Sequence, residues 1–229
     1  MVLERPCTTS RRPRVTAEMH SSNPFCTRFF RPGALPYWDT PQCDVDGLME
    51  QLATYRCWGQ IVGDHGSGKS TLVCDIQRHL RTRGYDVLDF VYTADRKPKH
   101  VARELVSRIQ ESSAGHNRIQ VTLDGFEQLS WYQRRQARSV GRRHGVGLLV
   151  TAHRALYGFP VLAQLKLTAE LAQRIVHHLV GESAAQFLGQ LDFAELCSCH
   201  KNNMRDILFD LYDRYSRSAT PGPVPPYLR

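Results

Sequence analysis

The sequence predicts an α/β protein in which helices cover both faces of a parallel sheet and a small all-helical region follows at the C-terminal end. Three observations predict this class. Short apolar runs alternate with stretches of helical periodicity between about residues 59 and 167. A glycine-rich loop ending in lysine and serine follows the first apolar run. After Thr168 the periodicity is helical only.

The expected strands are short and apolar, and a stretch of helical periodicity follows each of the first three. Strands are expected at 59–62, 86–92, 119–123 and 147–151, with a short fifth at 165–167. Helices are expected at 70–83, around 101–109, through about residue 143, from Thr168 as the N-cap, after Ser183 and from about 203 to 215. Because parallel strands need crossover connections, this alternation predicts parallel pairing.

Composition and charge narrow the class of protein. The 229 residues are 41% hydrophobic and 23% charged, which excludes wholesale disorder, and no apolar run approaches the roughly 18 residues of a membrane span. A net charge of +8 favours contact with polyanions but does not choose among nucleotide, nucleic acid and lipid surface. The seven scattered cysteines make a poor disulfide framework, and the N-terminus lacks a signal-peptide core, so the expected location is cytoplasmic.

One motif decides the expected chemistry. Gly63 to Ser70 match the pattern G-x-x-x-x-G-K-[ST], between an apolar run and a periodic helix. Glycines let successive backbone N–H groups turn toward phosphate oxygens, Lys69 reaches the β- and γ-phosphates, and the Ser70 hydroxyl binds Mg²⁺. The start of the helix adds a positive dipole end. The expected nucleotide-binding residues are Gly63, Asp64, His65, Gly66, Ser67, Gly68, Lys69, Ser70 and Thr71.

A phosphate loop of this kind needs an acidic partner at the end of another strand. Asp124 ends the apolar run at 119–123 and is the expected second Mg²⁺ ligand. Glu127, three residues further on, is the expected residue that polarises the attacking water. Acids also favour the first turn of a helix for electrostatic reasons alone, so these two assignments depend on the phosphate loop.

With these motifs the chain resembles P-loop ATPases of the AAA+ type, nearest to the origin-recognition-like and signalling ATPases with a small helical lid. The resemblance runs from about Asn23 to Tyr215 and rests mainly on the phosphate loop. It implies that a polar residue on the fourth strand senses the γ-phosphate. Thr151 matches that residue, and His153 is a near alternative. It also implies that the segment Asn23-Pro24-Phe25 leads into the adenine pocket.

The family's lid carries a G-N-x-R signature, which residues 202–205 resemble. The resemblance makes Arg205 a second sensor that reaches back to the nucleotide. Asn202 stands where the family usually has glycine, and Gly125 follows Asp124 where many members have glutamate. The second departure is shared by signalling ATPases that read D-G-x-[DE], and it leaves the efficiency of hydrolysis open.

Four parts are expected along the chain. They are a flexible basic N-terminal segment at 1–33, a P-loop NTPase core at 34–167, a helical lid at 168–217 and a flexible tail at 218–229. The aromatic residues and prolines between Asn23 and Trp38 are typical of an extended segment held on a domain surface.

The helix after Asp124 is strongly basic. Its arginines are Arg134, Arg135, Arg138, Arg142 and Arg143. Three interpretations stay open: a solvated charged face, an interface arginine that completes a neighbour's nucleotide site, or contact with a nucleic-acid backbone. Trp131 and Tyr132, at the start of this helix, are expected to pack against the core.

The expected function is ATP binding, with Mg²⁺-dependent ATP hydrolysis driving a switch or motor of AAA+ type. The catalytic group is expected to contain Lys69, Glu127, Thr151 and Arg205. One alternative is a P-loop kinase for a small molecule or nucleoside, with Asp95-Arg96-Lys97 as its substrate side. Another is a module that binds nucleotide without hydrolysing it. A homo-oligomer, a protein partner and nucleic acid are left open, as is ATP against GTP; no membrane contact is expected.

Overall fold

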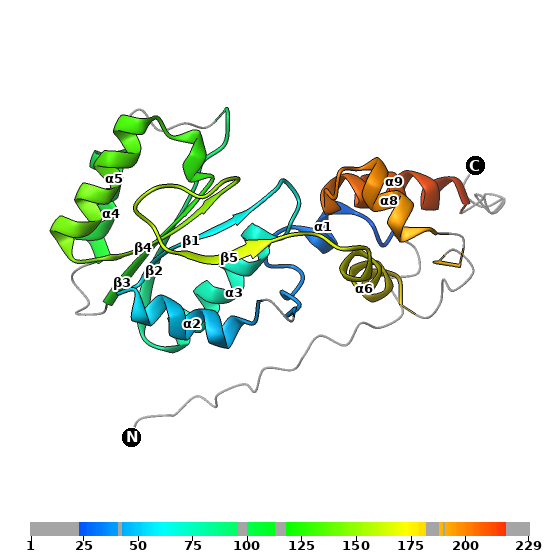
Figure 1. Cartoon of the computed structure of the whole chain (residues 1–229), viewed down its shortest axis with the longest axis horizontal. Coiled ribbons are helices and arrows are strands. Elements are labelled where there is room, and N and C mark those ends of the chain that lie inside the picture. Colours follow the sequence, from blue (N-terminus) through cyan, green and yellow to red (C-terminus); the bar gives the residue numbers. More distant parts are fainter. Residues whose placement is uncertain are drawn as a thin grey trace, which may run out of the picture.

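The structure is a computed structural model that describes residues 23–40, 43–95, 100–112, 118–181, 188–189 and 191–218. Figure 1 shows the sheet and its helices on one side and a group of helices at the C-terminal end on the other. Some of the sequence-based expectations lie outside the described residues. These concern residues 1–22, the helix start after Ser183, the pair Arg96-Lys97 and the tail from 219. Among those described, no helix is long and apolar enough to cross a membrane.

Five strands form one parallel sheet in the order β2-β3-β4-β1-β5. The strands are β1 (Trp58–Gly63), β2 (Tyr85–Val91), β3 (Arg118–Asp124), β4 (Gly147–Ala152) and β5 (Val161–Leu165). Every residue of β4 is buried, as expected for an interior strand of a parallel sheet covered on both faces. The predicted fold class is confirmed.

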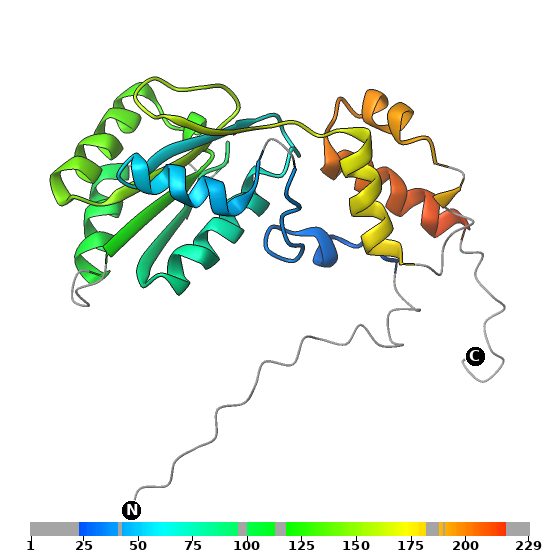
Figure 2. The ribbon, with the colours of Figure 1, turned by 60° about the horizontal axis from the view of Figure 1, so that its bottom comes forward.

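Helices cover both faces of the sheet (Figures 1 and 2). One apolar cluster joins α4 (Val101–Ser112) and α5 (Trp131–His144) to the sheet, and a second joins α2 (Val45–Thr54) and α3 (Lys69–Thr82) to the other face. A third cluster belongs to the C-terminal helices and is separate from the first two. Its helices are α6 (Ala169–Val180), α8 (Phe193–Cys199) and α9 (Met204–Ser218).

The fifth strand and helix α2 are among the elements that differ from the sequence prediction. The fifth strand is Val161–Leu165 and not 165–167, because Leu162, Ala163 and Leu165 pack into the cluster beneath α2 and α3. Leu167, whose alternation with Leu165 produced the prediction, instead packs with the C-terminal helices. Helix α2 was not predicted, and its N-cap Asp44 accepts a hydrogen bond from Gly47 N. The predicted N-cap Thr168 does accept one, from Leu171 N.

The segment 23–38, here called the strap, crosses from the C-terminal helices to α3. At its start Asn23 Nδ2 donates to Tyr212 O at 2.8 Å on α9, and the short helix α1 (Thr27–Phe30) follows. At its end Tyr37 N donates to Asp75 Oδ2 at 2.6 Å on α3. Arg78 Nη2 donates to Gly33 O at 2.7 Å beside it. Residues 23–33 are therefore packed, although the predicted N-terminal segment 1–33 included them as flexible; the four-part division otherwise stays a prediction.

Phe25 anchors the strap, since its side chain is 0% exposed and meets the Tyr215 ring edge-on at a centroid distance of 5.9 Å. We expect Phe25→Ala to lower the free energy of unfolding by about 3–5 kcal/mol, because the cavity cannot refill. Chemical denaturation measures this loss. The comparison change Phe209→Ala removes a ring that is 46% exposed and packs edge-on against Phe30, and it should cost less, about 1–2 kcal/mol. Equal losses in the two variants would contradict the anchoring role.

Candidate functional site

The glycine-rich loop lies between β1 and α3, where the sequence motif placed it. Gly66 and Gly68 have φ of +69° and +95°, a left-handed backbone that glycine adopts without strain. The loop is also crowded: a Cβ on Gly63 would lie 2.6 Å from Ser67 Oγ and 2.7 Å from Leu165 O, and one on Gly66 would overlap Asn203. The glycines of the motif therefore serve both the turn and its close packing.

Lys69 folds back over the loop. Its Nζ donates to Gly63 O at 2.7 Å and to Asp64 O at 2.8 Å, so the ammonium lies within the curve of the backbone. Burial lowers the pKa of Lys69 from its ordinary value, and the carboxylates of Glu127 and Asp124 oppose that shift. This places a partly desolvated cation beside two acids, at the position where the motif predicts phosphate.

Ser70 and Asp124 meet, as the sequence predicted. Ser70 Oγ donates to Asp124 Oδ2 at 2.6 Å, although the residues lie 54 positions apart. Thr151 Oγ1 donates to the other carboxylate oxygen at 2.5 Å and accepts from Gly125 N at 2.9 Å. A serine hydroxyl and a carboxylate are hard oxygen donors, so this pair fits Mg²⁺ in chemical type.

Thr151 lies on β4, as predicted, but its side chain is turned inward. The residue is 1% exposed, and its hydroxyl is occupied by Asp124 and Gly125. It fixes the Asp124 carboxylate in one orientation.

Glu127 sits on the short 3₁₀-helix η3 (Phe126–Gln128) and is paired with the alternative candidate His153. Glu127 Oε1 lies 2.9 Å from His153 Nε2, while Glu127 Oε2 is buried with no hydrogen-bond partner in the described part of the chain. The His153 ring also lies 3.9 Å from the ring of His65 in the phosphate loop. Burial, followed by the charge of Lys69, lowers the pKa of His153, so the imidazole is neutral at pH 7 and Nε2–H donates to Glu127.

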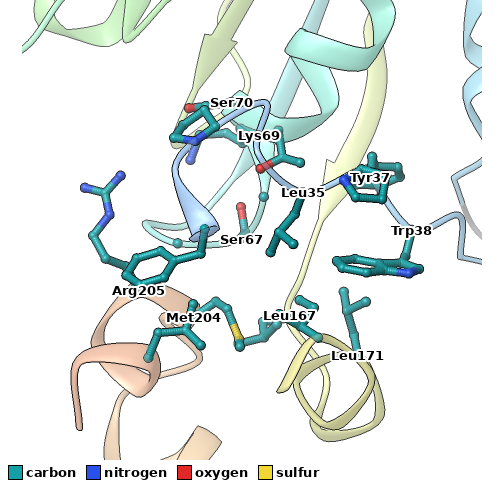
Figure 3. Close-up of a pocket in the computed structure, with 18 residues that line it drawn as sticks. Leu35, Tyr37, Trp38, Ser67, Lys69, Ser70, Leu167, Leu171, Met204 and Arg205 are labelled. Atoms are coloured by element: carbon teal, nitrogen blue, oxygen red, sulfur yellow. The ribbon is translucent and has the colours of Figure 1, made fainter. Parts of the chain in front are cut away.

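A pocket extends from the phosphate loop toward the C-terminal helices. Figure 3 shows Ser67, Lys69 and Ser70 on one side of it and residues of α6 and α9 on the other. Its remaining walls are largely apolar and come from the strap, from α6 and from α9. They include Phe30, Leu35, Tyr37, Trp38, Leu167, Leu171, Ile175, Met204 and Leu208. Phe25 itself is buried among the C-terminal helices, and the later part of the strap, which follows it in the chain, lines the pocket.

Arg205 lines the same pocket from the first turn of α9 (Figure 3). The turn before Arg205 contains Asn202, at the position where the G-N-x-R signature has glycine. Asn202 has φ of +56°, and asparagine tolerates this left-handed conformation better than most residues with a side chain. Glycine, which stands at this position in the G-N-x-R signature, would adopt the same backbone conformation without strain. Asn203 Oδ1 then accepts from Arg205 N at 3.1 Å, and the same amide borders Gly66.

The basic helix α5 is tied to its surroundings by three of its arginines. Arg134 donates to Leu129 O at 2.8 Å and to Glu127 O at 2.7 Å. Arg138 Nη1 donates to Tyr157 O at 2.9 Å. The Arg142 guanidinium lies 5.7 Å from the centroid of the Trp58 ring. These contacts are within the chain, and they were not predicted.

Trp131 and Tyr132 do not pack against the core, so that prediction is wrong. Their side chains are 70% and 62% exposed. The helix instead buries Ala137, Val140 and Gly141. The first turn of α5 is therefore directed toward solvent.

A parallel sheet with a G-x-x-x-x-G-K-S loop between β1 and α3 is the architecture of a P-loop NTPase core. No protein-family model matches the sequence, and no curated protein matches it. The chain is similar to the structure of the replication initiator DnaA bound to AMPPCP and single-stranded DNA, with a TM-score of 0.49 and 15% identity. The match covers 76% of this chain and 63% of that one.

AMPPCP-bound DnaA from Aquifex aeolicus gives a TM-score of 0.46 and 15% identity, over 76% of this chain and 63% of that one. PCH-2 from C. elegans gives a TM-score of 0.43 and 10% identity, over 75% and 67%. The likeness is one of fold alone, and the chain spans less than two thirds of the length of the two DnaA structures.

Proposed function

We propose that this protein binds ATP with Mg²⁺ and hydrolyses it, and that the bound state acts as a switch of AAA+ type. The observation that supports this most directly is the 2.6 Å hydrogen bond between Ser70 Oγ and Asp124 Oδ2 beside Lys69. Three residues that phosphoryl transfer requires, taken from two distant parts of the chain, lie together at one loop.

In this proposal the backbone amides of the loop and the ammonium of Lys69 bind the triphosphate. Ser70 and Asp124 are the residues that would hold Mg²⁺, which neutralises phosphate charge when bound. Thr151 keeps Asp124 in the orientation for this. The apolar walls of the pocket would hold the base, and Arg205 would contact the phosphates from α9.

Glu127 would orient the attacking water with Oε2, the carboxylate oxygen that has no hydrogen-bond partner among the residues that the structure describes. Its other oxygen accepts from His153, so the carboxylate cannot rotate freely. Because Thr151 is buried and occupied, we propose that His153, next to His65 and near Lys69, is the residue of β4 and its following loop that senses the γ-phosphate.

The pairing of His153 with Glu127 predicts an acid limb in the pH profile. Protonation of His153 places a second cation near Lys69 and weakens Glu127 as a proton acceptor, so kcat should fall as pH drops through the lowered pKa of His153, below 6.5. Because the pKa of His153 is lower in the folded protein than in the unfolded chain, the free energy of unfolding is also expected to depend on pH. The contribution of His153 is fully present above about pH 6.5 and is lost as the pH falls below that value, where the unfolded chain binds the proton more tightly.

His153→Gln supplies an amide donor that does not titrate, and His153→Ala supplies no donor. We expect the glutamine variant to keep more turnover at pH 7 than the alanine variant and to lose the acid limb. Initial rates between pH 5 and 8 measure both. An acid limb unchanged in His153→Gln would rule out His153 as its source.

The test of the proposed function is calorimetry of the folded protein with ATP and with GTP, each with and without Mg²⁺, followed by phosphate release. Binding strengthened by Mg²⁺, with phosphate released in water alone, is the expected result. Phosphate transfer only when an acceptor is added would favour the kinase alternative. Binding with no turnover would favour the non-hydrolysing module, and no heat with either nucleotide would refute the proposal.

The proposal assigns the protein to the cytoplasm, since all six described cysteines are free. The proposal leaves open whether the nucleotide-dependent change acts on another subunit of a homo-oligomer or on a protein partner. Phosphate release measured over a range of protein concentrations tests this, because sites shared between subunits make specific activity rise with concentration.

A further inference from the structure

Three aromatic side chains are exposed on or beside α5. Trp131 is 70% exposed, Tyr132 62% and Tyr157 96%. Nothing in the proposed nucleotide chemistry uses them. Exposing rings of this size forgoes the hydrophobic stabilisation that burial gives, so their position on the surface needs a reason other than folding.

The three aromatic residues all lie on α5 or on the loop that is bonded to it. Trp131 and Tyr132 lie four and three residues before Arg135, so both are neighbours of that arginine on the helix surface. Arg138 lies one turn further along, and its bond to Tyr157 O fixes the loop against α5. We call these five residues, Trp131, Tyr132, Arg135, Arg138 and Tyr157, the α5 platform. Seven residues from Trp131 to Arg138 correspond to about 10.5 Å along the helix axis.

The loop that carries Tyr157 is anchored two residues later. Phe159 is buried, stacks on Trp58 at a centroid distance of 5.6 Å and meets Phe126 edge-on at 5.5 Å. Gly158, between the two aromatics, has φ of +88°, which lets the chain reverse direction there. The fold therefore directs Phe159 into the core and leaves Tyr157 outside.

The charge around the α5 platform is positive. In fourteen residues α5 carries five arginines and no acid, and Arg135, Arg142 and Arg143 are exposed. Arg154, in the loop that also holds Tyr157, is exposed as well. The neighbouring α4 contributes both signs, with Arg103 and Arg108 against Glu104 and Glu111.

We propose that the α5 platform binds single-stranded nucleic acid, with the bases stacked on the aromatic rings and the phosphates next to the arginines. The guanidinium groups of α5, a helix that itself carries no acid, favour a polyanion. The exposed rings favour a polyanion whose bases are unpaired, because bases in a duplex are already stacked. A second copy of the chain fits this surface poorly, since each copy carries a net charge of +8.

The test is fluorescence anisotropy with a labelled 20-nucleotide oligo-dT strand, a duplex of equal length and heparin, all without nucleotide. We expect the single strand to bind more tightly than the duplex and heparin. Trp131→Ala and Tyr157→Ala should each weaken single-strand binding at least about fivefold, while Trp131→Phe, which keeps a ring, should stay near wild type. Arg135→Ala should lower the slope of log affinity against log salt by about 0.7.

The matched controls are Tyr55→Ala and Arg81→Ala, an exposed tyrosine on the residue after α2 and an exposed arginine of α3. Both should bind the strand like wild type. Equal affinity for all three polyanions, unchanged by loss of the rings, would overturn the proposal in favour of a purely electrostatic surface. No binding, with self-association lost in Trp131→Ala, would overturn it in favour of a protein interface. Lys69→Ala should bind the strand normally, so this result is independent of the nucleotide site.

Discussion

Replacing Lys69 with alanine is expected to lower kcat/KM for ATP by at least about 10²-fold and to remove most of the heat of nucleotide binding. The ammonium lies within the loop, 2.7 Å from Gly63 O, and partial burial strengthens its interaction with any phosphate that enters. Alanine leaves the backbone amides in place but takes away the one cation that the loop itself supplies. Calorimetry and phosphate release on the same preparation measure both effects.

Lys166→Ala is the matched control, because Lys166 is exposed after β5. Its kcat/KM should stay within about a factor of two of wild type. Circular dichroism must show that both variants are folded. If folded Lys69→Ala binds Mg²⁺-ATP as tightly as the control, the phosphate-binding role of the loop is wrong.

Glu127→Gln is expected to separate binding from turnover. The amide keeps the size of the side chain but cannot accept a proton from water, so kcat should fall by about 10²–10⁴-fold while the Kd for Mg²⁺-ATP changes little. Single-turnover hydrolysis beside equilibrium binding distinguishes the two quantities. Glu50→Gln makes the same change at an exposed position of α2 and should leave both unaltered.

A variant that loses both binding and turnover would indicate that Glu127 is needed for the structure of the site and not for chemistry. Arg134 donates to the backbone oxygen of Glu127, so this hydrogen bond is kept only if the backbone around residue 127 is unchanged. If Glu127→Gln preserves the thermal stability of the protein, that backbone is intact. Turnover equal to wild type would remove Glu127 from the mechanism.

Much of the fold follows from local patterns in the sequence. Apolar runs and helical periodicity located four of the five strands, and Thr168 marked the start of α6. Helix α2 carried the same kind of signal, with Leu48, Met49 and Leu52 on one face, and it could have been predicted. The shift of the fifth strand has a non-local cause, because Leu167 packs with helices that follow it.

The candidate site was predictable only where a motif fixes residue types. Ser70 and Asp124 were expected as a pair because a phosphate loop of this kind needs an acidic partner at the end of another strand. The contact of Glu127 with His153 depends on rotamers and on the path of the loop after β4, neither of which is encoded in spacing. The strap is similar: its bond from Tyr37 N to Asp75 joins residues 38 positions apart with no periodic signal.

The strap also limits how the two parts of the molecule can move. The chain passes between the sheet and the C-terminal helices twice, once along the strap between Phe30 and Tyr37 and once between Leu165 and Thr168. If both crossings stay intact, the sheet and the C-terminal helices can move as rigid bodies only by rotation about the line that joins the two crossings. That line is the hinge axis. Both crossings border the pocket, and a single angle would therefore open or close it.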